Sequence, residues 1–213
     1  MIISRVMTRN PVFIYQDMTI NEVQSIMEKK KVGHLPVLNK DDELIGIMTR
    51  KDLLKASPTI ATSLDMYEIS YLLSKIRVKD VMEKKVVSVN ENEIVEEAAR
   101  IMADNKIGCL PVINGKRLIG IITDTDIFHV FLAAFGARRS GLRIALNIED
   151  KPGQLAKLTR AVADKGGNVS SFVVSELDDR SWCHATLKVA DISREDMETI
   201  LKGFPEMEVE DLR

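Results

Sequence analysis

Cysteine is scarce in the sequence, with only Cys109 and Cys183 among 213 residues. The two lie far apart and form no Cys-x-x-Cys pattern, so the sequence indicates neither a disulfide framework nor a zinc knuckle. The chain also lacks an excess of charge of either sign, because its formal net charge is −2. Such a balance gives no overall attraction to nucleic acid or to anionic membranes. Binding to nucleic acid would require a local basic patch.

Long apolar runs are missing as well. The first ten residues, MIISRVMTRN, lack the uninterrupted apolar stretch of a signal peptide, and the longest apolar run, Phe128 to Phe135, is too short to span a bilayer. We therefore expect a cytoplasmic protein in a reducing compartment. Hydrophobic residues make up 45% of the chain and charged residues 29%, which is typical of a globular protein with a sizeable core.

An internal repeat organises the N-terminal part of the chain. Val6-Met7-Thr8 corresponds to Val81-Met82-Glu83, and at the same offset KVGHLPVL (31–38) corresponds to KIGCLPVI (106–113). After a one-residue deletion in a polar turn, LIGIMTRKDLL (44–54) matches LIGIITDTDIF (118–128). A repeat of this kind fixes the architecture before any residue is assigned a role.

Both copies predict the same order of elements. A strand (12–15; 86–89) precedes a helix whose apolar residues recur at helical spacing, and two short strands joined by a polar turn and a second helix follow. Thr19 and Glu22 form a capping-box pattern at the start of the first helix. Between the copies, 57–63 predicts a loop and 64–76 an amphipathic helix. The expected fold class is α/β (α+β).

The repeated motifs Met-Thr-x-x-Pro-Val, Gly-x-x-Pro-Val and Gly-x-x-Thr-x-x-Asp resemble those of the CBS domain. Two copies in tandem resemble a Bateman module, with the first copy and its connecting helix at 1–76 and the second copy at 77–136. The resemblance implies a regulatory protein, not an enzyme, that binds an adenine nucleotide (AMP, ADP or ATP) in the pair of copies. No other cofactor and no metal is implied.

The segment Thr49-Arg50-Lys51-Asp52 suggests a binding chemistry on its own. A strand ends in a hydroxyl at the start of a helix, where unpaired amides favour a phosphate group. The carboxylate on the first turn can accept hydrogen bonds from ribose hydroxyls. A capped helix, with Thr49 as N-cap and Asp52 at N3, explains the same residues. Recurrence of the pattern at Thr123 and Asp126 favours ligand binding.

The two copies differ in charge at the variable positions of this motif. Arg50-Lys51 in the first copy corresponds to Asp124-Thr125 in the second, and Thr8 corresponds to Glu83. Cations favour a polyphosphate and an added carboxylate opposes it, so we expect the first site to dominate for phosphorylated ligands. The alternative is that these side chains face solvent and have little influence. By resemblance, the adenine side of the first site is formed by Val12, Gly33 and His34, and that of the second by Val87, Gly108 and Cys109.

A different pattern begins after a glycine-flanked basic stretch, which predicts a linker at 137–141. Residues 142–213 predict the order β-α-β-β-α-β, which is ferredoxin-like. The segments DKPGQL (150–155) and GGNV (166–169) resemble the ACT domain, a module that binds amino acids between paired subunits. The alternative is a well-formed helix start in a domain that only dimerises. The resemblance implies an amino-acid site at Asp150, Gly153, Asn168 and Val169.

The whole order, two CBS copies and then ACT, resembles proteins of the AcuB type in acetoin utilisation. This resemblance implies a homodimer that regulates a metabolic enzyme or pathway in response to an adenine nucleotide. The sequence offers no motif for the target protein. A scaffold that binds no nucleotide is the simplest alternative.

The sequence gives little support to an enzymatic or a DNA-binding function. Asp124-Thr125-Asp126 could bind magnesium, but nothing in the sequence joins His34, His129 or His184 to a nucleophile. Cys109 has no activating neighbour and reads as a small core or pocket-wall residue. A DNA-associated transcriptional regulator would need a further domain, because the two modules leave no helix-turn-helix and the basic cluster around 138–143 is small.

Overall fold

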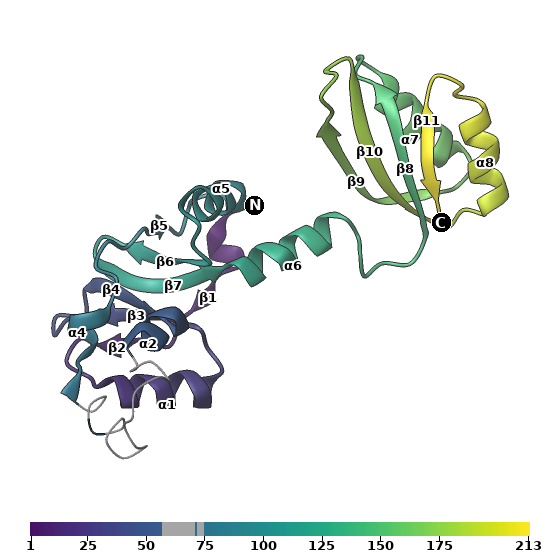
Figure 1. Cartoon of the computed structure of the whole chain (residues 1–213). Coiled ribbons are helices and arrows are strands. Elements are labelled where there is room, and N and C mark those ends of the chain that lie inside the picture. The colour runs from purple at the N-terminus through teal and green to yellow at the C-terminus, as the bar shows by residue number, and fades with distance from the viewer. Residues whose placement is uncertain (57–70, 72–74) are drawn as a thin grey trace. The chain divides into compact units, whose positions relative to one another are not determined.

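The computed structural model describes residues 1–56, 71 and 75–213, and the chain divides into two compact units, 1–127 and 128–213 (Figure 1). The predicted loop at 57–63 and most of the predicted helix at 64–76 lie outside the described residues. The division falls within helix α6 (Asp124–Ala134), before the linker predicted at 137–141.

The first repeat forms a three-stranded sheet in the order β2-β3-β4. Its strands are β2 (Ile14–Tyr15), β3 (His34–Leu38) and β4 (Leu44–Thr49), and its helices are α1 (Ile20–Lys30) and α2 (Arg50–Ala56). The predicted capping box is confirmed, because Thr19 Oγ1 accepts from Glu22 N at 3.3 Å and Glu22 Oε2 accepts from Thr19 N at 2.7 Å. The apolar face of α1 packs on the sheet through residues that include Val23, Met27, Leu35, Val37 and Met48.

The second repeat has the same order of elements in a four-stranded sheet, β1-β7-β6-β5. It contains α4 (Val78–Val81), β5 (Val89–Asn90), α5 (Val95–Asn105), β6 (Cys109–Asn114), β7 (Arg117–Thr123) and α6. The strands predicted at 12–15 and 86–89 are shorter or shifted, at Ile14–Tyr15 and Val89–Asn90, because only two residues of each pair with the neighbouring strand.

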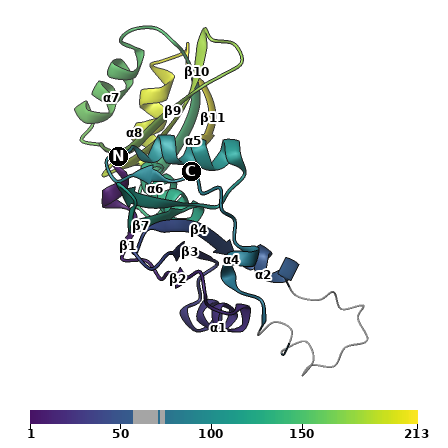
Figure 2. The ribbon, with the colours of Figure 1, turned by 90° about the vertical axis from the view of Figure 1, so that its left-hand side faces the viewer.

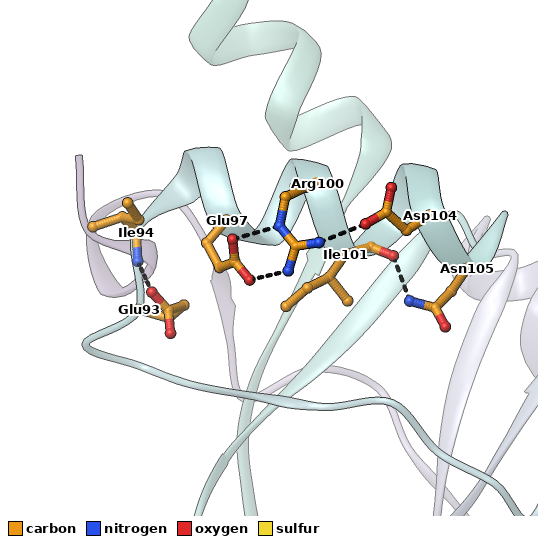
Figure 3. Close-up of polar contacts among 7 residues, drawn as sticks. All are labelled: Glu93, Ile94, Glu97, Arg100, Ile101, Asp104 and Asn105. Atoms are coloured by element: carbon orange, nitrogen blue, oxygen red, sulfur yellow. Dashed lines mark hydrogen bonds and ion pairs between the residues drawn. The ribbon is translucent and has the colours of Figure 1, made fainter.

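Helix α5 shows how these surface helices are held on their solvent side (Figure 3). Val95, Ala98 and Met102 are buried. On the exposed side, the guanidinium of Arg100 donates to Glu97 at 2.6 and 2.8 Å and to Asp104 at 2.5 Å. Pairs three and four residues apart lie side by side on a helix, so this arrangement supports α5 locally. The two carboxylates raise the pKa of Arg100.

The segments that begin the two repeats, around Thr8 in the first and around Glu83 in the second, are exchanged; we call them the leading segments. After the short helix η1 (Ile3–Arg5), strand β1 (Thr8–Arg9) of the first repeat pairs with β7 of the second, with Thr8 opposite Ile121. Reciprocally, Glu83 bridges Ile47 on β4, with backbone hydrogen bonds of 2.9 and 3.0 Å. Each sheet is therefore completed by the other repeat, which the sequence pattern alone did not predict.

The C-terminal unit has the predicted β-α-β-β-α-β order. Its sheet has the strand order β11-β8-β10-β9 with all neighbours antiparallel. Helices α7 and α8 cover one face of this sheet, where Leu158, Val162 and Met197 pack against Ile144 and Leu146 (Figure 2). The elements are β8 (Leu142–Glu149), α7 (Gln154–Asp164), β9 (Asn168–Glu176), β10 (Trp182–Ala190), α8 (Arg194–Lys202) and β11 (Glu208–Leu212).

No helix in the described ranges combines the length and the apolar character needed to cross a membrane.

Candidate functional site

Cavity A, of about 550 Å³, lies at the start of α2 and is walled by both repeats. The first repeat supplies the end of β4 and the first turn of α2, and the second repeat supplies the segments before β5 and at the start of β6. The volume is in the range of small-molecule sites. Its lining residues are Gly33, His34, Ile47, Thr49, Arg50, Lys51, Asp52, Lys55, Glu83, Lys85, Val86, Val87, Lys106, Ile107, Gly108 and Cys109.

Cavity B, of about 530 Å³, lies at the start of α6 and is formed by the corresponding segments with the roles of the repeats reversed. Here the second repeat supplies the strand end and helix start, and the first repeat supplies the segments around β1 and the start of β3. Its lining residues are Thr8, Asn10, Pro11, Val12, Lys31, Val32, Gly33, His34, Arg50, Ile121, Thr123, Asp124 and Thr125.

The two cavities do not group the predicted residues in the way that the sequence suggested. Asp52 shares a cavity with Val87, not with Val12, and Val12 instead lies with Thr123 in cavity B. Thr8 and Glu83 are also distributed differently from the expectation. Exchange of the leading segments brings Glu83 into cavity A and Thr8 into cavity B.

The predicted ribose-binding carboxylates take part in helix caps. Asp52 Oδ2 accepts from the backbone N and Oγ1 of Thr49 at 2.9 and 2.7 Å, and Thr49 Oγ1 accepts from Asp52 N at 3.3 Å. Thr123 and Asp126 repeat the arrangement, with hydrogen bonds of 2.8, 2.7 and 3.4 Å. The capped-helix interpretation therefore describes both residues. Asp52 also lines cavity A, whereas Asp126 is not among the residues that line cavity B.

Cavity A is strongly basic. Two acidic side chains, Asp52 and Glu83, face five basic ones, and none of the five forms an ion pair within the described part of the chain. Cavity B has Lys31 and Arg50 against Asp124. An uncompensated group of cations beside apolar wall residues favours an anionic ligand with an apolar part. The five basic residues are Arg50, Lys51, Lys55, Lys85 and Lys106.

Three of these basic residues, Lys55, Lys85 and Lys106, were not predicted from the sequence. A signal for one of them exists, because a lysine stands two positions before the glycine of each repeat, Lys31 before Gly33 and Lys106 before Gly108. The structure places Lys106 in cavity A and Lys31 in cavity B.

His34 and Cys109 occupy corresponding positions in the two repeats. Burial lowers the pKa of His34; the charge of Arg50 lowers it further, and that of Asp124 opposes the shift. Burial raises the pKa of the Cys109 thiol to about 12. Cys109 is only 4% exposed, which agrees with a pocket-wall residue and not with a nucleophile. No cluster of three metal-ligating side chains occurs in the described residues.

The predicted amino-acid site is not assembled within one chain. Asp150 and Gly153 lie at the end of the sheet where Trp182 pairs with Glu149, whereas Asn168 pairs with Ala190 at the other end of β10. At about 3.3 Å per residue these ends are roughly 25 Å apart. Val169, for its part, packs against the apolar core of the unit.

The loop before α7 nevertheless has two features of a binding site. Gly153 has a φ of 89° and leaves the start of the helix open, with no atom within 4 Å of a Cβ built on it. Gln154, the next residue, is 9% exposed, and its buried Oε1 atom has no hydrogen-bond partner among the residues that the structure describes. A buried acceptor of this kind calls for an explanation, and a ligand donor is one.

A family model described as CBS domain matches residues 3–59 and 78–133, which together make up more than half of the chain. A putative acetoin utilization protein (AcuB) from Vibrio cholerae is 30% identical; the match covers 65% of this chain and 95% of that one, with a TM-score of 0.54. The CBS domain pair of protein MJ0100, in complex with 5'-methylthioadenosine and S-adenosyl-L-methionine, is 25% identical over 62% of this chain and 99% of its own, with a TM-score of 0.52.

Similar repeats also occur within larger proteins. A homoserine O-acetyltransferase from Methanosarcina acetivorans is 34% identical over 131 residues, which are 61% of this chain and 22% of the enzyme. The chain thus spans less than a quarter of this curated relative.

Proposed function

The chain belongs to the CBS domain family, and we propose that it is a regulatory protein, not an enzyme, that binds an adenine nucleotide in cavity A. Its signal would be the nucleotide-dependent arrangement of the two repeats. The V. cholerae protein, 30% identical, supports acetoin utilisation as the regulated pathway.

The observation that carries this proposal is the group of five basic side chains around cavity A without ion-pair partners in the described residues. Phosphate groups are the ligands that such a group favours. The apolar residues Val86, Val87 and Ile107 also line this cavity and suit the faces of a purine ring. Asp52 supports a ribose contact, since its Oδ2 accepts from Thr49 while its Oδ1 accepts no hydrogen bond from the described residues.

Calorimetric titration of AMP, ADP and ATP tests the proposal. Asp52→Ala and Asp126→Ala form a matched pair, because each removes the carboxylate of an equivalent helix cap, but only Asp52 lines cavity A. Loss of a cap costs about 0.5–2 kcal/mol of stability in either variant. We expect Asp52→Ala to lose the tighter nucleotide site and Asp126→Ala to keep it.

Thermal melts of the same samples supply an independent readout. Nucleotide at a hundred times its dissociation constant should stabilise the wild-type fold by about 2.7 kcal/mol. If no adenine nucleotide binds the wild type or changes its melting temperature, the repeats are a scaffold and the proposal is wrong.

We further propose that the protein acts as a homodimer whose pairing responds to the nucleotide. Helix α6 has no buried residue, although seven of its eleven residues are apolar; Phe128 and Phe131 are 66% and 52% exposed. Exposed aromatic residues on one helix favour self-association. Sedimentation with and without AMP measures the mass, and a monomer in both conditions contradicts this proposal.

For the C-terminal unit we propose an ACT-type amino-acid site at the start of α7, supported by the unpartnered Oε1 of Gln154. Since Asn168 lies at the other end of the sheet, it could complete this site only from a second copy of the chain. A thermal-shift screen of the free amino acids tests the site. A stabilising amino acid should lose its effect in Gln154→Leu, and the absence of any stabilising amino acid leaves a unit that only dimerises.

A further inference from the structure

Cavities A and B share one wall. Gly33, His34 and Arg50 line both cavities, whereas Gly108 and Cys109, the counterparts of the first two, line cavity A alone. A charged side chain shared by two sites can neutralise a ligand in only one of them at a time. The shared wall thus provides a physical link between the two cavities.

The charges on either side of this wall are opposite. Arg50 and Asp124 occupy corresponding positions, since the Arg50 amide donates to Gly33 O at 3.1 Å and the Asp124 amide to Gly108 O at 2.9 Å. The Arg50 side chain is exposed and forms no ion pair in the described residues, so it is free to turn to either cavity. The Asp124 carboxylate is held locally, because its Oδ1 accepts from Thr125 N at 2.6 Å.

Gly108 marks the point where the two repeats meet across this wall. A Cβ at this position would stand 3.2 Å from Asp124 Oδ2 and 3.4 Å from His34 Nε2. The carboxylate of one repeat and the imidazole of the other therefore converge here. Because burial lowers the pKa of His34, the ring is neutral at neutral pH and Arg50 carries the positive charge of the shared wall.

An anion in cavity A would change the field in cavity B in two ways. It attracts the Arg50 guanidinium and so leaves Asp124 to face cavity B without that cation. It also repels a second anion through a wall of low dielectric constant, where charges interact more strongly than in water. Both effects weaken the binding of an anion in cavity B, and neither acts on an uncharged ligand.

We propose that anionic ligands in cavities A and B antagonise each other through Arg50. This inference rests on the proposed nucleotide site in cavity A. The filling of cavity A lowers the affinity of cavity B for a phosphorylated nucleoside by about tenfold, within the range usual for coupled sites. Thermodynamic linkage requires the same factor in the reverse direction.

The test measures the affinity of cavity B for AMP by calorimetry on the full chain. It compares the wild type, in which cavity A is already filled, with variants that do not fill cavity A. Val87→Trp blocks cavity A by volume, and Asp52→Ala weakens binding there by removing the proposed ribose contact. We expect both variants to bind AMP in cavity B about tenfold more tightly than the second binding step of the wild type. With adenosine, which has no phosphate, the variants and the wild type should show the same affinity for cavity B.

Arg50→Gln and Lys51→Gln form the control pair for the role of the shared cation. Both remove one charge from cavity A, but Lys51 does not line cavity B. Both should weaken the first AMP step, and only Arg50→Gln should reduce the tenfold difference. If the wild type binds AMP in two steps and cavity B has the same affinity for AMP in the wild type and in both variants, the antagonism is overturned while the nucleotide site stands. If the wild type binds no AMP, both the antagonism and the proposed nucleotide site in cavity A are overturned.

Discussion

The sulfur of Met82 lies 2.5 Å from the point where a Cβ would stand on Gly46, and Met7 bears the same relation to Gly120. Each methionine belongs to the leading segment of one repeat and each glycine to the last strand of the other. The glycine in each LIGI motif is therefore what allows the exchanged segments to pack closely on the sheets.

Gly46→Ala and Gly120→Ala should each destabilise the fold by about 1–3 kcal/mol, because the added methyl group overpacks a close contact. Urea denaturation measures the free energy of unfolding. Gly33→Ala is the control, since the nearest atom to its Cβ would be 3.9 Å away, and we expect a change within about 0.5 kcal/mol. Equal effects at the three positions would show that the contact with methionine is not the cause.

Stability should depend on pH through His34. Its pKa is lower in the folded chain than in the unfolded one, so the unfolded chain binds more protons as the pH falls below the ordinary histidine pKa of 6.5. The free energy of unfolding is therefore highest above this pH and decreases as the pH falls toward the lowered pKa. Urea denaturation between about pH 7.5 and 5.5 measures the slope. In His34→Gln the slope should be smaller; the same slope in both proteins contradicts the prediction.

Local signals predicted most of the fold and only part of the candidate site. The alternation and helical spacing in each repeat identified β4 and α1, and the Thr19 capping box depends on residues three positions apart, which sequence reasoning can relate. The exchange of Thr8 and Glu83 could not be found in this way. Such short pairing is decided by tertiary packing, because β1 pairs over only two residues and Glu83 forms a single bridge. This pairing in turn determines which residues face each cavity.

Cys109 should be unreactive in the folded protein. The residue is 4% exposed and the pKa of its thiol is raised to about 12, so almost none of it is thiolate at pH 8. Cys183, at 6% exposure, also has a raised pKa because of burial. We expect no release of chromophore from Ellman's reagent within minutes at pH 8, and reaction of both thiols in denaturant. Rapid reaction of one thiol in the folded wild type, lost in Cys109→Ala, would point to an accessible nucleophile in cavity A.

The basic side chains of cavity A should control the binding of phosphate groups. Lys84 and Lys85 are adjacent and both exposed, but only Lys85 lines cavity A. We expect Lys85→Glu to weaken ATP binding by roughly 10- to 100-fold, because it replaces a cation near the ligand by an anion. Lys84→Glu makes the same change of net charge outside the cavity wall, where solvent and salt screen it, and should weaken binding by less than about threefold.

The dependence of affinity on salt distinguishes the attraction between the basic side chains of cavity A and the phosphates of ATP from the packing of the adenine base. The affinity for ATP should fall as the salt concentration rises from about 0.05 to 0.5 M, while the affinity for adenosine should stay nearly constant, because only charged partners are screened. In Lys85→Glu the salt dependence of ATP binding should be shallower. Equal effects of the two lysine substitutions would mean that ATP responds to the net charge of the chain and not to the residues around cavity A.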